Sequence, residues 1–175
     1  MKKILFITTW LAISAMATVS YSHYNEKQYS LAEQGLEEIS PKLTGHINTL
    51  DYIVADLRDL ASKMPSGLEL CNTRAASEII EHQSMKAWYN RLLLQNLSAI
   101  KDGVNLGQMS TILRLSKEPL SNGIHRLNRI CGQTTAREQR KLLESARDSL
   151  YAVLAVYDEA ISVIKAAMLE GKTSP

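Results

Sequence analysis

A long amphipathic run near the end of the sequence, residues 135–170, constrains the fold most. Thr135 and Glu138 form a capping-box pattern at its start, and Gly171 marks its end. A helix of this length spans about 50 Å and is not stable alone in water, so the rest of the chain must cover its apolar face. That face carries apolar residues at steps of three and four: Leu143, Ala146, Leu150, Val153, Tyr157, Ala160, Ile164 and Ala167.

Four shorter helical segments are expected before this run. Ser40 and Pro41 should end the first, because proline lacks a backbone N–H and disfavours helix in the residue before it. Pro65 and Gly67 should end the second. The expected ranges are 24–39, 41–64, 72–101 and 105–132.

Two features of the fourth segment are specific enough to test. Asn105 is followed three residues later by Gln108, a pattern typical of a helix start. Pro119 removes a backbone donor in mid-segment and should kink or split the helix. Since no stretch alternates as a strand does, we expect an all-α antiparallel bundle of about five helices with one long C-terminal helix.

The first 22 residues have the pattern of a signal peptide. Lys2 and Lys3 precede a mostly apolar run, and the small residues Ser20 and Ser22 suit a cleavage site after Ser22. Ala15 and Ala17 offer a second site, and an uncleaved anchor is the alternative. We expect a periplasmic or secreted protein with no membrane span after cleavage, in which residues 23–175 form one helical domain.

The charge pattern argues against nucleic acid as a partner. The sequence has 20 basic and 18 acidic residues, so loss of Lys2 and Lys3 leaves 18 of each. Binding to phosphate backbones needs a basic excess. Residues 23–70 are acidic and residues 71–133 are basic, so the two segments either pack against each other or the basic one faces an acidic partner.

Cys71 and Cys131 are expected to form one intrachain disulfide. In an antiparallel hairpin of the third and fourth segments, the start of one and the end of the other meet, and the two cysteines lie at those ends. An even pair in an exported protein is typically bridged. A redox or nucleophilic pair is the alternative, but no Cys-x-x-Cys motif favours it.

The sequence offers little catalytic chemistry. His23, His46, His82 and His125 lie on separate segments without metal-ligand spacing, and no cofactor motif is present, so we expect no metal or cofactor. A small periplasmic enzyme or a binder of an anionic ligand is the alternative. Its residues would be a cationic and acidic cluster at a helix start: Arg137, Glu138 and Lys141.

The third segment is apolar on two faces. One face is an adequate core face: Ala76, Ile79, Ile80, Gln83, Ala87, Leu94 and Leu97. The second carries Met85, Trp88, Tyr89 and Leu92 at spacings of three and four. Another helix of the chain could cover it, or it could bind a partner, since Trp, Tyr and Met are enriched at interfaces.

We therefore expect an exported, non-enzymatic helical protein that acts through protein–protein interaction. An immunity or inhibitor protein, an exclusion factor, or an accessory of a secretion or conjugation apparatus would have these properties. Trp88 would anchor the partner with Met85, Tyr89 and Leu92, while Lys86 and Arg91 would set its orientation.

Overall fold

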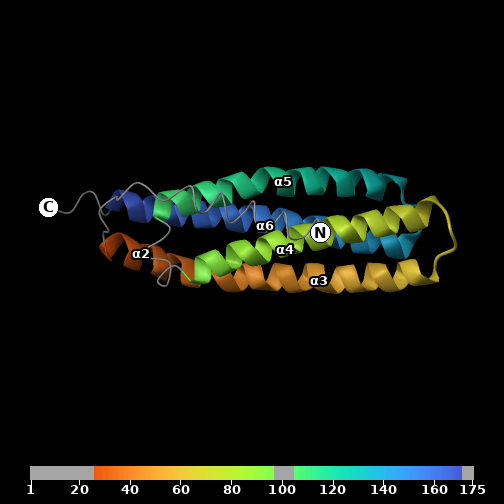
Figure 1. The fold of residues 1–175 in the computed structure, drawn as a ribbon, viewed down its shortest axis with the longest axis horizontal. Helices are drawn as coiled ribbons and strands as arrows, with labels where there is room; N and C mark the ends of the chain where they lie inside the picture. The colour runs from red at the N-terminus through yellow and green to blue at the C-terminus, as the bar shows by residue number, and fades with distance from the viewer. Residues whose placement is uncertain (1–25, 97–104, 171–175) are drawn as a thin grey trace, which may run out of the picture.

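The computed structural model describes residues 26–96 and 105–170, with side chains from residue 28 onward. The predicted signal peptide lies outside these residues. The described chain forms five helices and contains no strand (Figure 1). In order they are α2 (Glu26–Glu37), α3 (Ile39–Lys63), α4 (Leu68–Gln95), α5 (Leu106–Gln133) and α6 (Arg137–Glu170).

The helices lie side by side along one long axis, and α3 to α6 alternate in direction (Figure 1). Helix α3 packs mainly on α4 and α6, and α5 packs mainly on α6. Helix α2 covers the end of α6 and meets the beginning of α3. The predicted all-α bundle and its long C-terminal helix are confirmed.

The break between the first two helices falls at Glu38, slightly before the predicted position. Pro41 therefore lies in the first turn of α3, where a missing N–H costs little because that donor has no partner inside the helix. Helix α4 begins at Leu68, earlier than the predicted start at residue 72, directly after Gly67. The predicted helix end at residue 101 lies outside the described residues.

Helix α5 confirms the predicted cap. The Asn105 side chain accepts a hydrogen bond from the Gln108 N–H at 2.8 Å, and the Gln108 side chain accepts one from the Asn105 N–H at 3.0 Å. The predicted split at Pro119 is wrong, because α5 is continuous from Leu106 to Gln133. Packing along the bundle offsets the local loss of one backbone hydrogen bond.

The capping-box pattern at the start of α6 does not form. This helix begins at Arg137, and the Thr135 hydroxyl instead donates a hydrogen bond to the Glu69 carboxylate of α4. Thr135 is thus used to join two helices at one end of the bundle.

The predicted disulfide is wrong, since Cys71 and Cys131 are both free thiols and are not near each other. Both lie at the same end of the bundle, but helix rotation separates them. Cys71 is exposed on α4, whereas Cys131 is half-buried against the core. A similar position along the bundle axis therefore does not bring the two sulfur atoms together.

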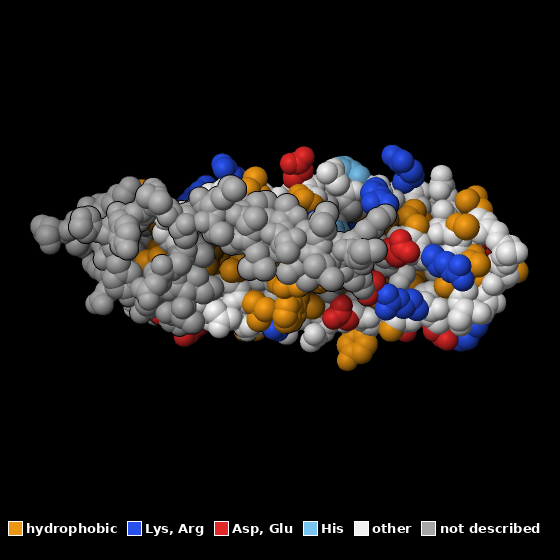
Figure 2. Space-filling view, viewed as in Figure 1, with side chains coloured by type: hydrophobic (Ala, Val, Ile, Leu, Met, Phe, Trp, Pro, Cys, Tyr) orange, Lys and Arg blue, Asp and Glu red, His pale blue; other side chains and the backbone are white. Residues whose placement is uncertain are grey.

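The apolar face of α6 forms the centre of the core, and all eight of its predicted positions are buried. They pack with apolar residues of the other four helices into one continuous cluster. In residues 26–96 and 105–170, no helix combines the length and hydropathy needed to cross a membrane. On the face shown in Figure 2, basic and acidic side chains are interspersed with hydrophobic ones.

Candidate functional site

Helix α4 differs from a simple bundle helix in what it buries. Beside its apolar core residues, its inner face carries five buried polar side chains: Thr73, Ser77, Gln83, Ser84 and Asn90. Buried polar groups need hydrogen-bond partners, so this face depends on neighbouring helices that supply them.

Helix α6 supplies two of these partners. The Gln139 amide donates to the Thr73 hydroxyl at 2.7 Å, and Thr73 donates to the backbone carbonyl of Glu69 at 2.7 Å. The Asn90 amide donates to the Tyr157 hydroxyl at 2.8 Å. All of these side chains except Glu69 are buried. The α4–α6 contact is therefore partly polar and directional.

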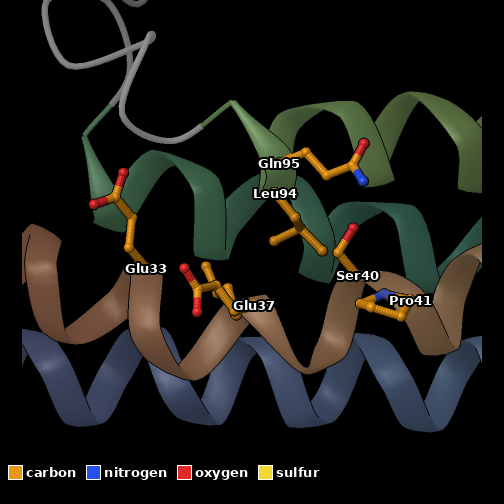
Figure 3. Close-up of a pocket in the computed structure, with 7 residues that line it drawn as sticks. Glu33, Glu37, Ser40, Pro41, Leu94 and Gln95 are labelled. Carbon is orange, nitrogen blue, oxygen red and sulfur yellow. The ribbon is translucent and has the colours of Figure 1, made fainter.

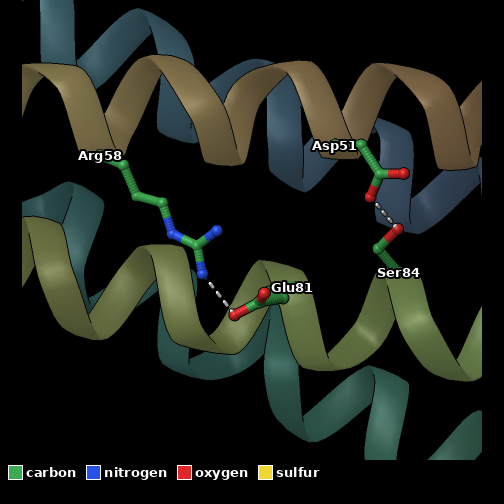
Figure 4. Close-up of polar contacts among 4 residues, drawn as sticks. All are labelled: Asp51, Arg58, Glu81 and Ser84. Atoms are coloured by element: carbon green, nitrogen blue, oxygen red, sulfur yellow. Dashed lines mark hydrogen bonds and ion pairs between the residues drawn. The ribbon is translucent and has the colours of Figure 1, made fainter.

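Helix α3 makes polar contacts with the other side of α4, and two of them are shown in Figure 4. The Ser84 hydroxyl donates to the Asp51 carboxylate at 2.6 Å. Arg58 forms an ion pair with Glu81 at 2.7 Å. In this pair the base lies on the acidic segment and the acid on the basic one, so it does not follow the charge complementarity considered from the sequence.

The contact between α4 and α5 depends on a glycine. A Cβ atom at Gly123 would lie 2.9 Å from Nε2 and 3.0 Å from Cγ of Gln83, so the absent side chain leaves room for the glutamine. Gln83 is buried, and its Oε1 atom has no hydrogen-bond partner among the described residues.

The outer side of α4 carries four large apolar residues. Met85, Trp88 and Tyr89 are 48%, 40% and 45% exposed, and Leu92 is half-buried. The Trp88 and Tyr89 rings meet edge to face, with centroids 5.2 Å apart and planes at 72°. The structure thus brings the four predicted apolar residues together on one side of a single helix, and the described chain leaves much of three of them uncovered. We call these four residues the α4 outer stripe.

The two predicted cationic residues, Arg91 and Lys86, have different surroundings. Arg91 turns toward α3, where its guanidinium donates to the Thr44 hydroxyl at 3.3 Å, and its Nε is buried with no hydrogen-bond partner in the described part of the chain. Lys86 is two residues before Trp88 and thus about 160° away around the helix axis. It is half-buried, and burial lowers its pKa. Lys86 is three residues before Tyr89 and Arg91 is three residues after Trp88, so each cation neighbours one ring of the aromatic pair along the helix.

Tyr52 of α3 extends the exposed apolar surface and was missed from the sequence. It is 75% exposed, and it follows Asp51, whose contact with Ser84 puts it near the level of Met85 along the bundle. Its position outside the apolar face of its own helix could be read from the sequence, but placing it beside α4 requires the pairing of α3 and α4.

The cluster considered for catalysis lies on the surface. Arg137, Glu138 and Lys141 are exposed in the first turns of α6. In the part of the chain that the structure describes, no group of three or more His, Cys, Asp or Glu side chains is arranged to hold a metal ion.

No protein-family model, curated protein or solved structure matches this chain.

Proposed function

We propose that this chain is an exported, non-enzymatic protein that binds another protein through the α4 outer stripe. The observation that carries the proposal is the mixed polarity of α4. Its inner face buries amides and hydroxyls beside its apolar core residues, while Met85, Trp88 and Tyr89 remain 40–48% exposed. Since burial of large apolar side chains is the main favourable term in folding, leaving them outside favours a role at an interface.

The residue types of the α4 outer stripe support the same proposal. Trp and Tyr supply large contact area at a small cost in side-chain entropy, and Met adapts to irregular surfaces. Tyr52 would enlarge the contact across α3. An immunity or inhibitor protein, an exclusion factor, or an accessory of a secretion or conjugation apparatus would use such a face.

Export is the second part of the proposal and has its own test. N-terminal sequencing of the protein recovered from the cell envelope or medium should begin at His23. An intact N-terminus in the cytoplasmic fraction would contradict export while leaving the binding proposal standing.

Binding can be tested with two tyrosines of similar exposure. A photoreactive amino acid replaces Tyr89 on α4 or, as the control, Tyr151 on α6, which are 45% and 48% exposed. We expect crosslinks to one identified partner from position 89 and none from position 151. The purified partner should then bind the wild-type chain in a direct titration.

Trp88→Ala gives the energetic test. It should weaken binding to that partner by about 2 kcal/mol or more, as loss of an interface anchor does. Because Trp88 is 40% exposed, the free energy of unfolding should fall by much less than for a fully buried aromatic residue. Equal losses in binding and unfolding free energy would assign Trp88 to the core and refute the proposal.

A further inference from the structure

A hollow of about 380 Å³ lies where α2, the beginning of α3 and the end of α4 meet (Figure 3). Leu36, Pro41 and Leu94 give it apolar walls, Glu33 and Glu37 border it from α2, and Gln95 lies at its rim. This volume is at the small end of the range for small-molecule sites, which suits a short-chain ligand.

The two glutamates lie one turn apart on α2 and therefore on the same face of the helix. Neither belongs to an ion pair among the described residues. Like charges at this spacing destabilise a helix, so a cation between them would be stabilising.

Ser40 provides independent evidence for a ligand. It is 6% exposed, it lines the hollow, and its hydroxyl oxygen is buried with no hydrogen-bond partner among the described residues. Figure 3 shows this hydroxyl directed from the start of α3 toward the end of α4. A buried hydroxyl without a partner is unfavourable, so a bound polar group would stabilise it.

The polar side chains that line the hollow are mostly hydrogen-bond acceptors. Apart from the Gln95 amide and the Ser40 hydroxyl, which can also donate, the polar groups at the hollow accept hydrogen bonds. They therefore match a ligand that carries positive charge and donates.

We infer that this hollow binds a primary alkyl ammonium group. The ammonium would donate to Glu33, Glu37 and Ser40, while its methylene chain would pack against Leu36 and Leu94. A divalent metal ion fits less well, since no cluster of three acidic, His or Cys ligands occurs in the described residues. The group could belong to a free diamine or to a lysine side chain of a peptide.

The test is an NMR titration of the isotope-labelled full-length chain at neutral pH and low ionic strength. The probes are cadaverine, a free diamine, and N-acetyl-lysine amide, a lysine side chain without a neighbouring free amine. Pentanol, of similar length but uncharged, is the control. We expect saturable shifts in the amides of the hollow with at least one amine and none with pentanol. The amine that binds more tightly identifies the source.

Matched variants separate this site from a generally acidic surface. Glu33→Gln with Glu37→Gln should raise the Kd about tenfold or more, because charge-assisted hydrogen bonds are lost. Ser40→Ala should raise it about fivefold. Glu38→Gln removes an exposed carboxylate that does not line the hollow and should change the Kd by less than about twofold.

Three results would overturn the inference. They are an absence of saturable shifts with both amines, equal binding of pentanol, and a loss of affinity in Glu38→Gln equal to that in the Glu33 and Glu37 variant. None of them depends on the α4 outer stripe, so failure here leaves the proposed function untouched.

Discussion

The buried contact between Asn90 and Tyr157 allows a stability prediction with a defined pH dependence. Both residues are 1% exposed, and the Asn90 amide donates to the Tyr157 hydroxyl at 2.8 Å. Tyr157→Phe removes the acceptor and leaves a buried amide donor unpaired. We expect the free energy of unfolding to fall by about 1 to 3 kcal/mol at neutral pH.

This difference should shrink at high pH. Burial raises the pKa of Tyr157 from 10.0 to about 12, although the Asn90 hydrogen bond offsets part of that effect. Below pH 10.0 the phenol is protonated in both the folded and unfolded states, so its contribution to stability is complete. Above pH 10.0 the unfolded chain loses the proton first, and wild-type stability falls until about pH 12.

The pKa difference of about two pH units corresponds to roughly 2 to 3 kcal/mol. Phenylalanine has no proton to lose, so the wild-type advantage should vanish or reverse near pH 12. Urea unfolding followed by far-UV circular dichroism, at neutral pH and at several alkaline pH values, measures both effects. Tyr151→Phe, at an exposed position of the same helix, should change stability by less than about 0.5 kcal/mol at neutral pH. A stability difference between wild type and Tyr157→Phe that stays constant with pH would refute the reasoning.

Three further predictions follow from packing and thiol exposure. Gly35→Ala should lower the free energy of unfolding, measured with urea, by about 1 to 3 kcal/mol, because the new Cβ would lie 2.5 Å from a stiff Val163 methyl. The control Gly45→Ala, whose Cβ would meet nothing within 4 Å, should raise it by about 0.5 to 1 kcal/mol. Equal effects of the two variants would contradict the close approach of α2 to α6. Thr73→Val should lower the free energy of unfolding, measured by thermal unfolding, by about 1 to 3 kcal/mol, because the Gln139 amide loses its acceptor. An unchanged free energy would mean that water solvates the Gln139 amide. Thiol titration of the purified protein, with no reductant added, should find that Cys71 reacts quickly and Cys131 more slowly. Cys71→Ser should leave the melting temperature nearly unchanged. Mass mapping that found a disulfide between the two cysteines would refute this prediction.

The sequence predicted those features of the fold that depend only on residues close together in the chain. The period of apolar residues identified the buried face of α6, and the pair Asn105 and Gln108 identified the cap of α5. Both depend on spacings within one helix. The continuity of α5 through Pro119 was missed because support from neighbouring helices outweighs a local penalty.

The cysteines show what sequence spacing does not determine. Cys71 does lie near the start of α4 and Cys131 near the end of α5, yet a disulfide also requires the two Cβ atoms to face each other across about 4 Å. That depends on how far each helix is rotated about its own axis. Packing of α4 on α3 and of α5 on α6 leaves Cys71 outward and Cys131 inward.

Rotation of α4 also decides whether its second apolar face is core or surface. The hydrophobic pattern alone is ambiguous, since a turn of about 100° would bury Met85 in place of Ser84. Polar contacts with α3 favour the observed rotation, since Ser84 bonds to Asp51, Glu81 pairs with Arg58 and Arg91 donates to Thr44. The ion pair is exposed and contributes little, so the part-buried hydrogen bond of Ser84 is a stronger constraint than that pair. The polar contacts of the inner face thus act together with its apolar residues to keep the α4 outer stripe toward solvent, where the proposed partner would bind it.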